Sequence, residues 1–330
     1  MAQPVRKRPK PNDIVMKKIS LIIGLFLAFA AVLGAQEAYS PTGTYLFSTK
    51  DGQDLYLDDY HATAGSETTL DGKSKPTIVF MFGGGFITGS RNEKYFMPWF
   101  KKLNDAGYRV ISIDYRLGMK GVKTSGGMSS VKAFRHSAQI AAEDLFSATE
   151  YLIRNKGKLG IDTDNLVISG SSAGAIAVLE ADWLLCNGRA TDFLPDGFHY
   201  AGVMPFAGAI ISVEGVPSYK VPPAPTAFFH GTDDKIVNYK KIHLLKWGLF
   251  GSDKLVKIFK KNGYTYNVFR YEGHSHEIAS AFINSFPEQI RFLETNVIRG
   301  LSWTVDSSID DPDIQAFDFP NNRKKLYSPD

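Results

Sequence analysis

The feature that most constrains the fold is an alternation of short apolar runs, rich in β-branched residues, with amphipathic stretches of helical length. This alternation predicts an α/β fold, in which helices cover both faces of a mostly parallel sheet. The central runs are almost entirely apolar, as strands buried on both faces must be. The candidate strands are Thr44–Ser48, Asp54–Asp58, Thr77–Phe82, Arg109–Asp114, Asn165–Ser169, Gly202–Phe206, Thr226–His230 and Thr265–Tyr271. The sequence therefore predicts an eight-stranded sheet.

The segments between these runs predict helices, loops and a tail. Apolar residues recur at helical spacing between residues 141 and 152. Turn-forming residues in Gly118–His136 and Cys186–His199 predict loops near the carboxyl edge of the sheet, where ligands bind in open parallel sheets. Either loop is a candidate wall of a substrate pocket or a solvated connection. The last thirty or so residues predict a surface tail without chemistry.

The first 35 residues predict a targeting segment. Residues 19–35 form an uncharged apolar stretch that follows Lys17 and Lys18 and closes with small residues. This layout is typical of a secretory signal peptide, and we expect cleavage near Gly34-Ala35 in a secreted or periplasmic protein. A start at Met16 fits this leader better than the first methionine. An uncleaved membrane anchor is the alternative, because about 17 apolar residues is the lower limit for a span.

Charge and cysteine content exclude several partners. Residues 1–35 hold six lysines and arginines and one aspartate, a net +5, so the chain's +4 leaves −1 for residues 36–330. A domain without a basic surplus is not expected to bind nucleic acid. The single Cys186 can form neither an internal disulfide nor a thiolate metal cluster. We expect no cofactor, and contact with a membrane only if the leader is retained.

The segment Gly170-Ser171-Ser172-Ala173-Gly174 carries the strongest catalytic signal. It follows a predicted strand and opens a helix of small and apolar residues. A G-x-S-x-G motif in this position predicts a nucleophile elbow, a strained turn that presents Ser172 with the Ala173 N–H beside it. Glycines two residues to either side let strand and helix approach closely. The competing interpretation is an ordinary glycine-rich turn.

A second glycine segment, Phe82-Gly83-Gly84-Gly85-Phe86, follows the strand Thr77–Phe82. Successive glycines leave backbone N–H groups unobstructed, so they can stabilise a developing oxyanion. A phosphate-binding loop is the alternative, but the GK[ST] ending and the G-x-G-x-x-G spacing are both missing.

A serine nucleophile needs a base and an orienting carboxylate. Five histidines follow the elbow, and His274 and His276 come just after the last predicted strand. Asp233 and Asp234 follow the strand that ends at His230. Because neighbouring residues in a turn point in different directions, only one aspartate should face the imidazole. The residues alone leave both choices open, and they predict a structural role for His230.

Five segments in the same order make the chain similar to the α/β-hydrolase superfamily, specifically to secreted carboxylesterases of the bacterial acetyl esterase and hormone-sensitive-lipase-like group. The resemblance extends over residues 78–282. The matching segments are Phe82–Phe86, Asp114–Arg116, Gly170–Gly174, His230–Val237 and Tyr271–His276. It implies an α/β-hydrolase domain at residues 36–330, with short cap-like loops and a C-terminal tail.

Carried over position by position, the resemblance implies roles for six residues. Ser172 is the nucleophile, Asp234 the acid and His276 the base, while Gly84, Gly85 and Ala173 supply oxyanion N–H groups. Phe82 departs from the family, which usually has a histidine there. That histidine braces the glycine loop, so the departure concerns loop geometry and not the triad.

The implied function is hydrolysis of carboxylic esters through an acyl-enzyme. Small esters with short acyl or feruloyl groups, or acylated carbohydrates, are the expected substrates. Three alternatives remain: a serine exopeptidase of the same fold, a non-catalytic binding protein, and a metal-dependent hydrolase using His274, His276 and Glu277. The adjacent Glu143 and Asp144 diverge on a predicted helix, so we expect them to cap or pair at the surface.

Overall fold

The computed structural model describes residues 39–123, 127–190 and 192–315. The chain divides into two units, residues 1–40 and 41–330, and every element described below belongs to the second. The predicted signal peptide, residues 1–35, lies outside the described residues, as does the end of the predicted tail.

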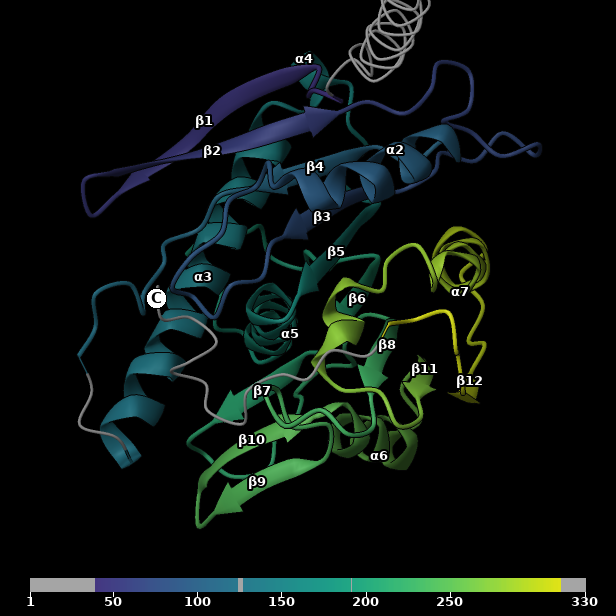
Figure 1. Cartoon of the computed structure of the whole chain (residues 1–330). Coiled ribbons are helices and arrows are strands. Elements are labelled where there is room, and N and C mark those ends of the chain that lie inside the picture. Colours follow the sequence, from purple (N-terminus) through teal and green to yellow (C-terminus); the bar gives the residue numbers. More distant parts are fainter. Residues whose placement is uncertain (1–38, 124–126, 191, 316–330) are drawn as a thin grey trace, which may run out of the picture. The chain divides into compact units, whose positions relative to one another are not determined.

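A nine-stranded sheet forms the centre of the second unit (Figure 1). Its strands are β1 (Gly43–Lys50), β2 (Gln53–Tyr60), β3 (Thr77–Met81), β4 (Val110–Ile113), β5 (Leu166–Ser171), β6 (Gly202–Phe206), β8 (Thr226–Gly231), β11 (Tyr266–Tyr271) and β12 (Val305–Ile309). They lie in the order β1-β2-β4-β3-β5-β6-β8-β11-β12. The pairs β1/β2 and β2/β4 are antiparallel, and all later neighbours are parallel.

The predicted α/β fold is confirmed, and each of the eight expected strands lies in this sheet. The strand count is corrected from eight to nine, because β12 comes from the segment expected to be a tail. Strands β3, β5 and β6 are buried at every residue, which gave them continuous apolar sequences. Strand β12 is an edge strand whose residues alternate between half-buried and exposed, so its sequence, VDSSI, carries little apolar signal.

Helices cover both faces of this sheet (Figure 1). Their bounds are α2 (Met97–Asp105), α3 (Gly127–Arg154), α4 (Lys156–Leu159), α5 (Ala173–Cys186), α6 (Ser252–Asn262) and α7 (Phe286–Phe292), with 3₁₀ turns η1 (Lys94–Phe96) and η2 (His276–Ser280) and a π-helical turn η3 (Leu293–Ile298). Helices α3 and α5 pack together on one side of the sheet, and α2 and α7 lie on the other. The Trp99 indole N–H joins α2 to Gln289 of α7 at 2.8 Å. Within the described ranges, every helix is too short or too polar to span a bilayer.

A second, three-stranded antiparallel sheet was not expected from the sequence. It contains β7 (Ala209–Ser212), β9 (Lys241–Leu244) and β10 (Trp247–Gly251), in the order β7-β10-β9. The strands have four or five residues, and β9 is exposed at each of its four positions. Such short strands, one of them with no buried face, lack the apolar periodicity on which sequence prediction depends.

One of the two predicted loops is mostly helix. Residues 127–136 of Gly118–His136 form the start of α3, which is 28 residues long. Its glycines and serines fall at the beginning of the helix, where these residues are tolerated better than in the interior. In the other predicted loop, Cys186 closes α5 and the described residues after it form turns.

Candidate active site

The turn between β5 and α5 has the strained geometry of a nucleophile elbow. Ser172 lies between the two elements with φ 50° and ψ −110°, a conformation that costs free energy outside glycine. A Cβ atom at Gly170 would lie 2.4 Å from the backbone of Gly174, and one at Gly174 would lie 2.1 Å from the Met81 carbonyl oxygen. Only glycine at these two positions lets β5, α5 and β3 approach this closely.

Three side chains from different parts of the chain form a continuous relay, which we call the serine cluster. Ser172 follows β5, Asp234 follows β8 and His276 opens η2 after β11. Ser172 Oγ lies 2.8 Å from His276 Nε2, and His276 Nδ1 lies 2.7 Å from Asp234 Oδ2. All three residues are buried. Since β5, β8 and β11 run in the same direction, their carboxyl ends bring these residues to one edge of the sheet.

The network fixes the arrangement of protons. A carboxylate accepts hydrogen bonds only, so His276 Nδ1–H donates to Asp234 and leaves Nε2 to accept from the Ser172 hydroxyl. Imidazole in this tautomer can take the serine proton.

Asp234 is held by more than His276. Its Oδ1 accepts the backbone N–H groups of Ile236 at 2.8 Å and Val237 at 3.0 Å, and His230 Nε2 lies 3.2 Å from Oδ2. Burial by itself raises the pKa of Asp234, but hydrogen bonds from His230 and His276 outweigh it and hold the pKa well below its ordinary value. The carboxylate therefore stays ionised at neutral pH.

His230 has the structural role expected for it. Its Nδ1 lies 2.8 Å from Ser252 Oγ, and its Nε2 lies 2.9 Å from the Val237 carbonyl oxygen as well as near Asp234. The ring is fully buried. It anchors the loop that carries Asp234, so a predicted structural residue supports the serine cluster directly.

The geometry separates the two pairs of adjacent candidates. Asp233 is exposed, and its backbone N–H bonds to the His274 carbonyl oxygen at 2.9 Å. The His274 ring lies 3.1 Å from Glu277 Oε1 and 3.1 Å from the Asp311 carbonyl oxygen. His274 is buried. Of the two pairs, His276 contacts Ser172 and Asp234 contacts His276.

His274 and His276 consequently belong to separate networks and do not share a ligand position. Among residues 39–123, 127–190 and 192–315, no group of three or more His, Cys, Asp or Glu side chains is arranged to hold a metal ion.

The glycine loop after β3 runs along the elbow. A Cβ atom at Gly83 would lie 3.4 Å from the Ser172 Cβ, and one at Gly84 would lie 2.1 Å from the Thr88 carbonyl oxygen. Gly84 and Gly85 have φ values of 107° and 64°, which favour glycine. Within the described chain, the N–H groups of Gly84, Gly85 and Ala173 donate no hydrogen bond. These amides therefore have no competing acceptor among the described residues.

Tyr115 braces the glycine loop at the position where Phe82 replaces histidine. The Phe82 and Tyr115 rings stack with centroids 4.3 Å apart. The Tyr115 hydroxyl donates to the carbonyl oxygen of Phe82 at 2.7 Å. This contact was not predicted, although the segment Asp114–Arg116 had been matched at the end of β4, next to β3. The stacked pair holds the entry to the loop without a histidine.

A small, mostly apolar pocket opens beside Ser172. It encloses about 340 Å³ together with the solvent at its mouth. Its lining residues are Gly85, Phe134, Ser172, Ala173, Ile176, Ile236, Val237 and Leu249. Phe134 comes from the segment Gly118–His136, which therefore does supply a wall, but from a helix. Of Cys186–His199, no described residue lines the pocket.

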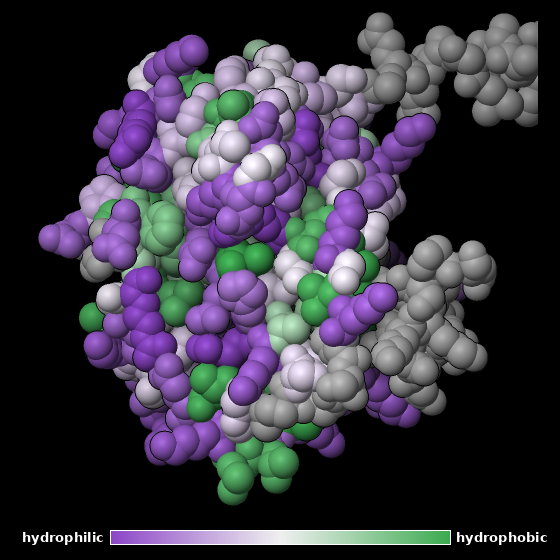
Figure 2. Space-filling view, turned by 90° about the vertical axis from the view of Figure 1, so that its left-hand side faces the viewer, coloured by the Kyte–Doolittle hydropathy of each residue, from purple (hydrophilic) through white to green (hydrophobic). Residues whose placement is uncertain are grey.

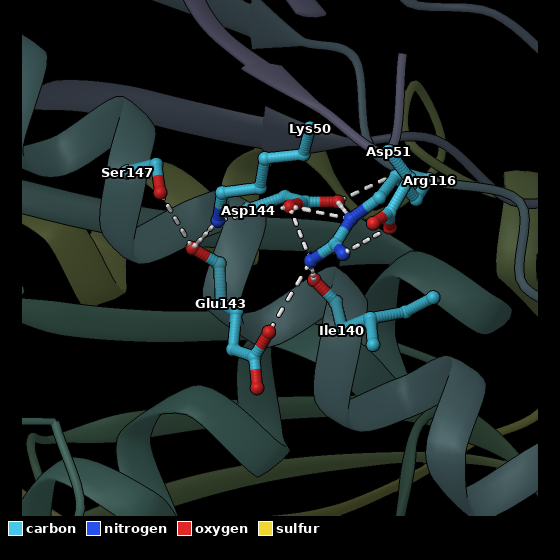
Figure 3. A network of polar contacts seen from close by, with 7 residues as sticks. All are labelled: Lys50, Asp51, Arg116, Ile140, Glu143, Asp144 and Ser147. Carbon is cyan, nitrogen blue, oxygen red and sulfur yellow. Dashed lines mark hydrogen bonds and ion pairs between the residues drawn. The ribbon is translucent and has the colours of Figure 1, made fainter. Parts of the chain in front are cut away.

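A second polar network, drawn in Figure 3, contains no residue that lines the pocket. Asp144 is fully buried, contrary to the expected surface position. Its carboxylate accepts hydrogen bonds from the side chain and the backbone N–H of Arg116, and Lys50 Nζ lies 3.2 Å away. Arg116 also pairs with Asp51 at 2.8 Å and with Glu143 at 3.2 Å. We call these five residues the arginine cluster.

Sequence comparison finds two matching family models. The BD-FAE model matches residues 67–182, and the phospholipase/carboxylesterase model matches residues 128–294, which is half of the chain.

Among curated proteins, a secreted lipase from Gibberella zeae is 24% identical over 224 residues, which cover 65% of this chain and 39% of the lipase. Phenmedipham hydrolase from Pseudarthrobacter oxydans is 32% identical over 110 residues, covering 33% of this chain and 20% of that protein. Ethyl acetate hydrolase from Pseudomonas putida is 27% identical over 138 residues, covering 42% and 37%. The chain thus spans less than two fifths of the length of each relative.

Among solved structures, esterase Est2 from Thermogutta terrifontis superposes with a TM-score of 0.52 at 19% identity. The match covers 77% of this chain and 94% of Est2. At this identity the likeness concerns the fold, which is that of an α/β-hydrolase.

Proposed function

The chain belongs to the phospholipase/carboxylesterase family of α/β-hydrolases, and from this premise we propose that it is a serine carboxylesterase. The hydrogen-bonded series from Ser172 through His276 to Asp234 is the observation that carries the proposal. Beside it lie three backbone N–H groups that donate no hydrogen bond to any residue the structure describes. Ester hydrolysis of this kind requires a nucleophile, a base, a charge that orients the base, and donors for the oxyanion, and the arrangement offers a candidate for each.

The proposed reaction has two halves. His276 Nε2 takes the Ser172 proton while Oγ attacks the ester carbonyl carbon, and Asp234 stabilises the imidazolium that forms. The carbonyl oxygen becomes an oxyanion, for which the N–H groups of Gly84, Gly85 and Ala173 are the proposed donors. The tetrahedral intermediate collapses, and the imidazolium gives its proton to the leaving alcohol.

In the second half, water attacks the acyl-enzyme and His276 takes its proton. A second tetrahedral intermediate releases the carboxylic acid, and Ser172 regains its proton from the imidazolium. No cofactor is needed, since the Ser172 proton leaves with the alcohol and a proton from water replaces it, so both side chains end as they began.

We propose small carboxylic esters as substrates, with a short acyl or feruloyl group in the pocket and an alcohol that can be part of a carbohydrate. The pocket's apolar lining and small volume support a compact apolar group. The names of an ethyl acetate hydrolase and a lipase among the relatives support an ester bond. Residues 19–35 support export of the protein.

Labelling by a fluorophosphonate, together with hydrolysis of p-nitrophenyl acetate, tests the proposal. The wild-type protein should label and hydrolyse, also in excess chelator. Ser172→Ala should abolish labelling and lower kcat by at least about 10⁴-fold. Ser171→Ala is the matched control, because it removes the neighbouring hydroxyl, which bonds to the Ala279 carbonyl oxygen, and should leave labelling intact.

The other outcomes identify the alternatives. A folded wild-type protein that neither labels nor hydrolyses any small ester would be a non-catalytic binding protein. Loss of activity in chelator would favour metal chemistry. Faster cleavage of aminoacyl p-nitroanilides than of esters would identify an exopeptidase.

A further inference from the structure

The hairpin of β9 and β10 presents an apolar face that begins at the pocket. Its register pairs Ile242 with Leu249 and Leu244 with Trp247. Side chains directly opposite each other in an antiparallel pair lie on the same face, and so do residues two apart in one strand. Ile242, Leu244, Trp247 and Leu249 therefore share one face, which we call the hairpin platform.

The hairpin platform is open to solvent. Ile242 is 53% exposed and Leu244 is 70% exposed, while Trp247 and Leu249 are half-buried. The opposite face of β10 behaves differently, because Phe250 is fully buried. Four contiguous apolar residues at the surface are unusual outside a binding site. In Figure 2 a hydrophobic group projects at the lower edge of the molecule, at the height where Figure 1 places β9 and β10.

Leu249 belongs to both the pocket and the hairpin platform. The surface is thus continuous from the wall beside Ser172 to the exposed end of the hairpin. Phe134 of α3 is also in the lining, and Val131, one helical turn earlier, is 38% exposed. Apolar residues of two elements, β10 and α3, therefore line the pocket and have exposed apolar neighbours.

The size of the pocket indicates what would use this route. Its volume of about 340 Å³ includes the open mouth, so the enclosed part suits only the first few carbons of an acyl chain. A longer chain bound to Ser172 must leave the pocket. The hairpin platform is an apolar surface that shares the lining residue Leu249 with the pocket.

We propose that the hairpin platform is an extended subsite for the acyl chain of medium- and long-chain esters, beyond the carbons held in the pocket. The inference rests on the proposed function. In this proposal Ile242, Leu244 and Trp247 determine which acyl chains bind, and they take no part in the reaction itself.

The test compares the double variant Ile242→Thr, Leu244→Ser with the wild-type protein on two p-nitrophenyl esters, the acetate and the decanoate, each as a monomer in solution. Acetate should react at an unchanged kcat/KM, which also shows that the variant is folded. For the decanoate, kcat/KM should fall about tenfold, mostly through KM, because apolar contacts that hold the chain are lost. Leu70→Ser is the matched control, since Leu70 is a fully exposed leucine in another loop and should change neither rate.

The outcomes distinguish failure of this inference from failure of the proposed function. If the wild-type protein hydrolyses acetate but the variant retains full activity on decanoate, the subsite is refuted and the esterase stands. Equal loss on both esters would mean that the hairpin only supports the pocket. If the variant loses activity only on esters presented in micelles or vesicles, and none on the monomeric esters, the hairpin is a lipid-docking surface. If the effect follows the length of the alcohol in alkyl acetates, the acyl assignment is wrong. A wild-type protein that hydrolyses no ester refutes the proposed function.

Discussion

The serine cluster and the arginine cluster are both polar networks built around a buried aspartate, but they differ in where the network ends. In the arginine cluster, Asp144 faces Arg116 and Lys50, and Arg116 also meets two further carboxylates. Each of these charges therefore has a partner within the network. In the serine cluster, contacts run from Asp234 through His276 to the Ser172 hydroxyl, which lines the pocket.

This difference teaches how the same side-chain chemistry serves two purposes. A closed network of charges holds segments together, because each charge would be costly if its partner were lost. A network that ends on an atom in a pocket can pass charge and protons to a bound molecule. The two clusters should therefore respond to the loss of their aspartates in opposite ways, one in activity and the other in stability.

Asp234→Asn should have the largest effect. An amide in place of the carboxylate removes the charge that stabilises the His276 imidazolium and favours the wrong tautomer, so kcat should fall about 10³- to 10⁴-fold. Steady-state kinetics on p-nitrophenyl acetate measures this effect. Asp233→Asn is the matched control, since Asp233 is the exposed neighbour, and it should change kcat little. If Asp233→Asn is the damaging change, our assignment of the acid is wrong.

Asp144→Asn should lower stability and leave the chemistry intact. Burial opposes the charge of Arg116, but hydrogen bonds to Asp144, Asp51 and Glu143 raise its pKa above the ordinary value, so the guanidinium remains charged. Removing the carboxylate should lower the free energy of unfolding by about 3 kcal/mol. Urea denaturation measures this value, and kcat of the folded variant should remain within a few-fold of wild type.

The control for this variant is Glu143→Gln. The Glu143 side chain is 44% exposed and bonds to the same arginine, so its loss should cost less than about 1 kcal/mol. An Asp144→Asn protein of normal stability but without activity would break the distinction between the two clusters.

The sequence predicted the central fold well because a strand that is buried on both faces has a continuous apolar sequence. Strands β3, β5 and β6 read as continuous apolar runs, and every residue in them is buried. Strand β12 and the β7-β10-β9 sheet gave no such signal, because edge strands and four-residue strands mix exposed and buried positions. The second sheet could not be assembled without knowing what β7 packs against.

The parts of the site that depend on a short sequence motif were predictable. The glycines around Ser172 mark the elbow, since a Cβ atom at either position would collide with backbone. The choice of Asp234 over Asp233 came from a family resemblance, because the residues alone do not give the direction of a side chain in a turn. The pocket walls Phe134 and Leu249 come from α3 and β10, which meet only through tertiary packing. The catalytic roles themselves remain predictions.

A third buried carboxylate, that of Glu180, belongs to neither the serine cluster nor the arginine cluster. Glu180 lies on α5, eight residues after Ser172, and is fully buried. Within the described residues, neither of its carboxylate oxygens has a hydrogen-bond partner. Burial raises its pKa to about 7, although the charges of Arg135 and Arg189 act in the opposite direction. Unlike Asp234, whose pKa is lowered, Glu180 should hold its proton in mildly acidic solution.

Glu180→Gln should therefore change the pH dependence of stability. The folded pKa of about 7 lies above the ordinary value, so the stability contributed by the protonated carboxyl is complete in acid and is lost as pH rises through 7. At about pH 8 the variant should be more stable than wild type by about 3 kcal/mol, and at about pH 4 the two should be nearly equal. Denaturant unfolding across this range measures the difference. Glu67→Gln, at an exposed position, should leave the profile unchanged.

Burial also raises the pKa of Asp182 to about 7. The stability of the Glu180→Gln variant should therefore still depend on pH, and the additional change Asp182→Asn should remove that dependence. A constant difference between Glu180→Gln and wild type at every pH would mean that the Glu180 carboxyl does not titrate differently on folding, and that a partner compensates its burial as Arg116 compensates Asp144.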